Sequence, residues 1–181
     1  MKQPSVALIA LALALRATVP GALVAEERGA EPAAGPGEAA APLADFAVLT
    51  GSTWHAEGEG FSSTLTYRSQ IEGHVLEGAN ELRNGEGAVI GRYRGSYAWD
   101  AGRNEVVYWM GSARGEVHRG RAWWRDGVLW HEAEVSGGKI TTYASAVRPT
   151  DGGLEYYADY GAERATPELL AGDPLVYRKQ D

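Results

Sequence analysis

The chain has 181 residues, of which 44% are hydrophobic, and it contains 24 glycines, 6 tryptophans, 9 tyrosines and no cysteine. This length fits one domain with appendages, and the hydrophobic content is enough for a packed core. Without cysteine the chain has no disulfide, no thiolate metal site and no cysteine nucleophile. Its formal net charge of −7 argues against a broad nucleic-acid-binding surface, so no nucleic-acid partner is expected.

Residues 1–25 have the features of a secretory signal peptide. Lys2 supplies the positive charge, residues 6–15 form an apolar run, and a small-residue site ends at Ala25. The run is too short to span a bilayer, which takes roughly 20 residues. We therefore expect the leader to be removed, the mature chain to have no integral membrane span, and the protein to be periplasmic or secreted. An uncleaved anchor is the alternative.

The next segment, 26–42, consists of Ala, Gly, Pro and charged residues without an apolar period, so it is predicted to be a flexible linker. The apolar stretch 43–49 predicts one or two helical turns. Thr166 followed by Pro167 predicts a second short helix over 166–170, because Thr caps helices and Pro favours their first turn.

From Trp54 onward the chain reads as short strands separated by turn dipeptides. The clearest turns are Asn84-Gly85, Arg114-Gly115, Asp126-Gly127, Gly137-Gly138 and Asp151-Gly152. The pattern is all-β and predicts an antiparallel up-and-down meander of about nine to ten strands, closed into a barrel so that no edge is exposed. Residues 43–181 would form this barrel domain together with the short N-terminal helix. A two-sheet sandwich is the alternative.

Turn positions predict which side chains face inward. A two-residue turn at Asp126-Gly127 places Arg121 opposite Glu132, and these paired charges belong outside. The opposite face then points inward, with His118, Gly120, Ala122, Trp124, Leu129, His131, Ala133 and Val135.

The same reasoning applies to the two flanking hairpins. A turn at Gly137-Gly138 places Val135 opposite Ile140, which puts Thr142, Ala144 and Ala146 inside. A turn at Asn84-Gly85 places Glu77 opposite Arg92, outside. The inward set on that side is Leu65, Tyr67, Ile71, His74, Leu76, Gly78, Asn80, Val89, Tyr93, Tyr97 and Trp99.

Small residues among aromatic ones predict a hollow interior that holds a ligand. Its walls would be Tyr93, Tyr97, Trp99 and Trp124, and its polar anchors His74, His118 and His131. In the alternatives, the segment around Phe46 and Leu49 fills the space, or the barrel is flattened.

No motif assigns a catalytic residue, a metal site or a cofactor. His118 and His131 would lie about 13 Å apart on neighbouring strands, too far to share one metal ion. We therefore expect a small-molecule-binding barrel for a mostly apolar or aromatic ligand. Two other functions stay open: a cofactor-free isomerase or cyclase with an interior His as general base, and a non-catalytic interaction domain.

An aromatic stripe is predicted on the outer face. Tyr108, Trp123, Trp130 and Tyr143 would align across neighbouring strands and form a homodimer or partner interface. In the alternatives, a terminal segment covers the stripe, or the faces of these strands are inverted and the stripe is core.

The segment 43–181 resembles the calycin group, which includes lipocalins, fatty-acid-binding proteins and nitrobindin-like barrels. The likeness is carried by a short leading helix, the Gly51-Ser52-Thr53-Trp54 entry to the first strand, and the closing Tyr177-Arg178. The resemblance implies a barrel in which Trp54 closes one end, packed by Arg178. Nitrobindin-like proteins bind haem through a His near the final strands. No His follows His131, so that role is not carried over.

Overall fold

The structure is a computed structural model that describes residues 43–180, so the predicted leader and linker lie outside the described residues. Its strands are β1 (Thr53–Gly58), β2 (Phe61–Gln70), β3 (Val75–Asn84), β4 (Val89–Asp100), β5 (Glu105–Ser112), β6 (Val117–Arg125), β7 (Val128–Ser136), β8 (Thr142–Thr150), β9 (Gly153–Tyr160) and β10 (Leu175–Gln180). Three short 3-10 helices accompany them: η1 (Ala44–Leu49), η2 (Ile71–Gly73) and η3 (Pro167–Ala171). Within these residues no helix is long and apolar enough to cross a bilayer.

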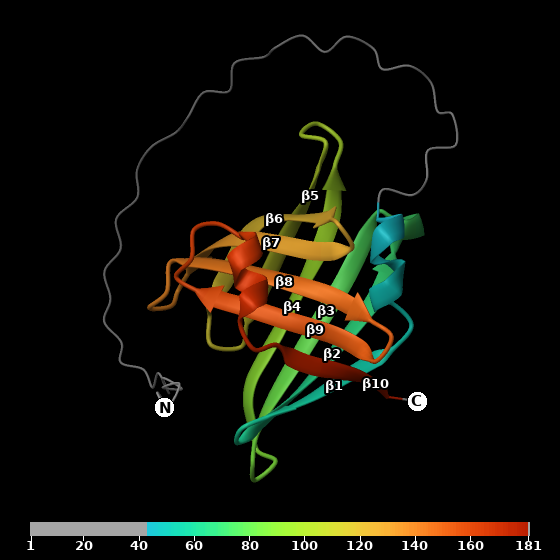
Figure 1. The fold of residues 1–181 in the computed structure, drawn as a ribbon. Coiled ribbons are helices and arrows are strands. Elements are labelled where there is room, and N and C mark those ends of the chain that lie inside the picture. The colour runs from blue at the N-terminus through green and yellow to red at the C-terminus, as the bar shows by residue number, and fades with distance from the viewer. Residues whose placement is uncertain (1–42, 181) are drawn as a thin grey trace. The chain divides into compact units, whose positions relative to one another are not determined.

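The strands form one closed antiparallel barrel (Figure 1). Each strand pairs with the next along the chain, and β1 pairs with β10 to complete the ring. This confirms the predicted all-β meander and its closure into a barrel. The two short helices expected near 43–49 and 166–170 are present as η1 and η3.

The β6–β7 hairpin has the predicted register. Asp126 and Gly127 both have positive φ, 54° and 73°, as a tight two-residue turn between twisted strands requires. Arg121 therefore lies opposite Glu132, and its Nη2 donates to a Glu132 carboxylate oxygen at 2.8 Å on the outer face. The inward set predicted for these two strands is correct.

The predicted register of β8 is wrong by one residue. The β7–β8 connection is a longer loop over 137–141, and His131 lies opposite Ser145 instead of Ala144. Because side chains alternate along a strand, this slip reverses the face of every residue. Ser145 and Tyr143 therefore point into the barrel, whereas Ala144 and Ala146 point outward and are covered from outside.

The β3–β4 hairpin keeps the predicted faces along most of its length but not the predicted pairs. Its loop is longer than two residues and is followed by a bulge, so Arg92 lies opposite Glu81, not Glu77. Three residues assigned to the interior lie elsewhere. The bulge turns Val89 to the outer face opposite Arg83, where it is 37% exposed. Ile71 sits in η2 with 70% of its surface exposed, and His74 follows it in the same turn, also exposed.

The outer aromatic stripe does not exist as predicted. The four-residue β4–β5 connection places Tyr108 opposite the inward-facing Tyr97, and the register of β8 turns Tyr143 inward as well. Trp130 does face outward, but it is 7% exposed and belongs to a cluster against which Leu169 and Leu170 of η3 pack. Self-association stays a prediction. Tyr108 and Tyr143 are buried and cannot contribute to an interface between two copies of the chain.

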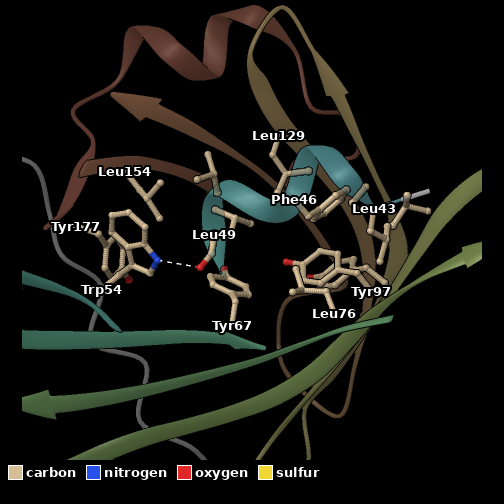
Figure 2. Packing of buried hydrophobic residues seen from close by; sticks show 14 of the residues in the cluster. Leu43, Phe46, Leu49, Trp54, Tyr67, Leu76, Tyr97, Leu129, Leu154 and Tyr177 are labelled. Carbon is tan, nitrogen blue, oxygen red and sulfur yellow. Dashed lines mark hydrogen bonds between the residues drawn. The ribbon is translucent and has the colours of Figure 1, made fainter. Parts of the chain in front are cut away.

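One end of the barrel is filled by η1 (Figure 2). Leu43, Phe46 and Leu49 point inward and are almost fully buried, at 6%, 2% and 0% exposure. The indole Nε1 of Trp54 donates to the Leu49 carbonyl oxygen at 3.1 Å and fastens the helix to the first strand. Trp54 thus helps to close this end. Arg178 does not pack on it, because Arg178 lies opposite His55 on the outer face and is exposed.

Two of the inward glycines allow close strand contact instead of opening a cavity. A Cβ on Gly120 would lie 1.8 Å from the Glu132 carbonyl oxygen, and one on Gly95 would lie 1.9 Å from the Trp109 carbonyl oxygen. These glycines are needed because the backbones of β6 and β7, and of β4 and β5, approach closely there.

Candidate functional site

A polar cluster lies in the middle of the apolar core. The Tyr97 hydroxyl is 3.0 Å from Nε2 of His131, and Nδ1 of His131 is 3.1 Å from the Ser145 hydroxyl. The three side chains come from β4, β7 and β8, and all are at most 4% exposed. The closed barrel therefore brings together residues that are far apart in the chain.

Burial controls the ionisation of this cluster. It lowers the pKa of His131 to about 4, because the charged imidazolium would lose its hydration, although a hydrogen bond to the Ser145 backbone opposes the shift. Burial also raises the pKa of Tyr97 well above its ordinary value. At neutral pH the cluster consists of a neutral phenol, a neutral imidazole and an alcohol.

Aromatic rings surround the cluster on the side of η1. Tyr97 stacks on Tyr108 with ring centroids 5.5 Å apart, and Phe46 tilts against Tyr97 at 5.4 Å. Trp124 meets Phe46 edge-on at 5.9 Å. Two of the predicted ligand walls, Tyr97 and Trp124, therefore contact the chain's own Phe46, and Trp99 packs against the same core.

A second aromatic group lies toward the opposite mouth. Trp124 is near the end of β6 that meets η1, whereas His118 is near the other end of the same strand. Around His118 lie Tyr93, with ring centroids 6.3 Å away, and Tyr143, at 5.2 Å. Tyr160 adjoins Tyr143 at 5.3 Å and is 60% exposed, so the arc of rings reaches solvent.

The polar groups of this arc are also uncharged at neutral pH. Burial lowers the pKa of His118, although the nearby Glu116 carboxylate raises it in part. Burial raises the pKa of Tyr93, with Glu116 adding to the rise. The mouth offers neutral donors and acceptors among aromatic ring faces.

The predicted site residues thus fall into three groups. Tyr93 and His118 lie at the mouth, Tyr97 and His131 share the central cluster, and Trp99 and Trp124 belong to the end that η1 fills. The exposed His74 joins none of them.

Sequence reasoning missed Ser145, Tyr108 and Tyr143 as interior residues. Their faces depend on loop lengths at 101–104 and 137–141, where a difference of one residue reverses the assignment. The sequence did contain a sign that the predicted register of β8 is wrong. That register places the small Ala144 and Ala146 inside and the bulky Tyr143 outside.

The described residues outline two shallow surface hollows. One, of about 440 Å³, lies beside η1 and is bordered by Asp45, Val48 and Trp124 among others. The second, of about 410 Å³, lies beside the start of β1 and includes Gly51 and Arg68. Over the same residues, 43–180, no group of three or more His, Asp or Glu side chains has the spacing to hold a metal ion.

Comparison with known proteins gives a likeness of fold. No known protein family and no curated protein matches the chain. Among solved structures it is similar to the crystal structure of Rv2717c from M. tuberculosis, with a TM-score of 0.52 and 15% sequence identity over 78% of this chain and 99% of that one. This match fits a lipocalin-like barrel fold, and at this identity it bears on the fold alone.

Proposed function

We propose that this protein is a calycin-type barrel that binds a small, mostly apolar molecule at the mouth opposite η1. The observation that carries the proposal is the arc of rings around His118: Tyr93 and Tyr143 flank it, and Tyr160 extends the arc to solvent. Binding pockets for small molecules typically combine aromatic walls with a few well-placed polar groups.

The chemistry of the mouth favours an uncharged aromatic ligand. Phenol and imidazole edges can donate and accept hydrogen bonds, and ring faces can stack on a planar molecule. The charged groups close to Tyr93 are the Glu116 carboxylate and the Arg114 guanidinium, and their opposite signs give the mouth no net attraction for an anion or a cation. The ligand would therefore be a neutral planar ring system with one or two polar atoms.

Fluorescence titration with the neutral probe N-phenyl-1-naphthylamine tests this proposal. We expect saturable binding that weakens in the His118→Ala and Tyr93→Ala variants. His55→Ala is the matched control, because His55 lies on the outer face, hydrogen-bonded to Glu57. Equal loss in all three variants, or no saturable binding to the folded wild type, would refute a site at this mouth.

Native mass spectrometry of protein purified from its own compartment adds a second readout. A co-purified small molecule that is lost in His118→Ala would identify the natural ligand. Conversion of that molecule during incubation, abolished in the same variant, would instead assign the barrel to the cofactor-free enzymes.

Export is part of the proposal and rests on the leader-like composition of residues 1–25. Intact-mass measurement of the protein from fractionated cells tests it. A mature chain that begins at Glu26 in the periplasm or the medium supports export, and an unprocessed chain in the cytoplasm contradicts it.

A further inference from the structure

The central cluster is too deeply buried to touch a substrate. Tyr97 and His131 are 3% and 4% exposed, and η1 closes the nearer end of the barrel with Phe46 packed on the Tyr97 ring. Chemistry that needs contact with a substrate is therefore excluded for this pair in the closed barrel. An electron, however, can move between closely packed aromatic rings without such contact.

A hydrogen bond offers the proton of Tyr97 an acceptor. Nδ1 of His131 lies 3.1 Å from the Ser145 hydroxyl, which can accept the ring proton. In that tautomer Nε2 is an acceptor, and the Tyr97 hydroxyl donates to it at 3.0 Å. A phenol that donates to a neutral imidazole can lose its electron and its proton together.

A row of paired residues connects Tyr97 with the surface. Around the barrel, Tyr97 lies opposite Tyr108, Tyr108 opposite Gly120, Gly120 opposite Ala133, and Ala133 opposite Tyr143. Gly120 and Ala133, the two small residues in the middle of this row, contribute no ring between Tyr108 and Tyr143. The last pair joins Tyr143 with the exposed Tyr160, whose ring is 5.3 Å away.

We propose that this row is an electron-transfer path and that the Tyr97–His131 pair is a one-electron donor that traps an oxidising equivalent in the core. A one-electron oxidant of the peroxyl-radical class takes an electron from Tyr160 at the mouth and becomes the peroxide anion, while the Tyr160 proton passes to water. An electron from Tyr97 then moves through Tyr108 and Tyr143 and restores Tyr160, which regains a proton from water.

The oxidation of Tyr97 accounts for every electron and proton at the Tyr97–His131 pair. Tyr97 has lost one electron, its O–H bond breaks, and its proton forms a bond to Nε2 of His131. The products are a neutral Tyr97 phenoxyl radical, a His131 imidazolium and the reduced oxidant. An oxidised phenol is a far stronger acid than an imidazolium, so the imidazole accepts the proton even though burial lowers its pKa to about 4.

Photogenerated tris(bipyridine)ruthenium(III) is a suitable oxidant for the test, with electron paramagnetic resonance as the readout. Wild type serves as the parent protein, because Tyr160 is the first donor of the proposed path. We expect a long-lived tyrosyl radical in wild type and its loss in Tyr97→Phe, which leaves the short-lived signal of the exposed Tyr160. The matched control is Tyr108→Asn, which removes the ring of the path next to Tyr97 and should slow radical formation while the Tyr97 signal is kept.

The partner residue supplies the second half of the test. His131→Leu should lose the long-lived signal, and Ser145→Ala, which keeps the imidazole, should retain it even if the leucine variant fails to fold. A slower radical yield in heavy water would report the coupled proton transfer. The proposal is overturned if the long-lived radical persists without the Tyr97 hydroxyl, or if the folded wild type forms no long-lived tyrosyl radical. Neither result bears on ligand binding at the mouth.

Discussion

The ring of Phe46 in η1 lies 5.4 Å from the ring of Tyr97 in β4, so the segment before the first strand provides part of the barrel core. Phe46 is 2% exposed, and we expect Phe46→Ala to lower the free energy of unfolding by about 3–5 kcal/mol. Val48 in the same helix is 45% exposed, and Val48→Ala should change the free energy by less than about 0.5 kcal/mol. Urea denaturation of both variants measures the difference, and similar losses would contradict a core role for η1.

His131 should make stability depend on pH. Its pKa is about 4 in the folded protein and about 6.5 when unfolded, so below pH 6.5 the unfolded chain binds the proton more readily. The contribution of His131 to the free energy of unfolding is therefore fully present above pH 6.5. It is lost as the pH falls toward 4, by about 3 kcal/mol in total.

Denaturation of wild type and His131→Gln across pH 4 to 7 isolates this contribution. The stability difference between the two proteins should shrink or reverse as the pH falls, because glutamine does not titrate. The pKa of His118 is also lowered, so His118 contributes in the same direction to both proteins and cancels in the comparison. A pH-independent difference would contradict the burial of a neutral His131.

Gly120 should not tolerate a side chain. A Cβ there would lie 1.8 Å from the Glu132 carbonyl oxygen, which forces β6 and β7 apart. We expect Gly120→Ala to cost at least about 1–3 kcal/mol of stability. Gly172→Ala is the control, because a Cβ at that position has its nearest neighbour at 3.6 Å and its φ of −79° is ordinary. Thermal unfolding separates the two, and a stable Gly120→Ala protein would show that the strands are not in close contact.

Glu132 should hold the segment that covers Trp130. Besides its bond with Arg121, its carboxylate accepts from the Ala165 amide at 3.0 Å and lies 3.7 Å from Arg164. We expect Glu132→Ala to increase the quenching of tryptophan fluorescence by acrylamide, because the loop leading to η3 loses an anchor.

Arg121→Ala provides the comparison for that experiment. It removes an exposed ion pair worth no more than about 1 kcal/mol and leaves the Ala165 contact in place. Its fluorescence quenching should stay close to that of the wild type. Equal quenching in the two variants would contradict a specific anchoring role for Glu132.

The fold was predictable wherever local turn chemistry determined the pairing. Asp126-Gly127 requires a two-residue turn, and the whole β6–β7 register follows from it. Gly137-Gly138 looks equally decisive in the sequence, yet it belongs to a longer loop, and one extra residue reverses the faces of β8. Local dipeptides do not reveal loop length when the flanking residues can also be accommodated in the loop.

The candidate site was predictable only in part for a related reason. His118 and His131 were correctly placed inward, because they share the β6–β7 hairpin. Their neighbours Ser145 and Tyr143 come from β8 and depend on the register that failed. Whether Phe46 fills the interior is a matter of packing between distant segments, and residue type alone does not determine it.

The pairing of Thr53 with Gln180 places the first and last strands side by side. Every strand in the barrel therefore has two hydrogen-bonded neighbours, and the order of the strands around the barrel is their order in the chain. A peptide linking Gln180 to the start of η1 would let the chain be opened at another hairpin, such as Asp126-Gly127, with every strand pairing retained. The barrel is thus a scaffold for circular permutation, in which the choice of new ends decides which strands are made first.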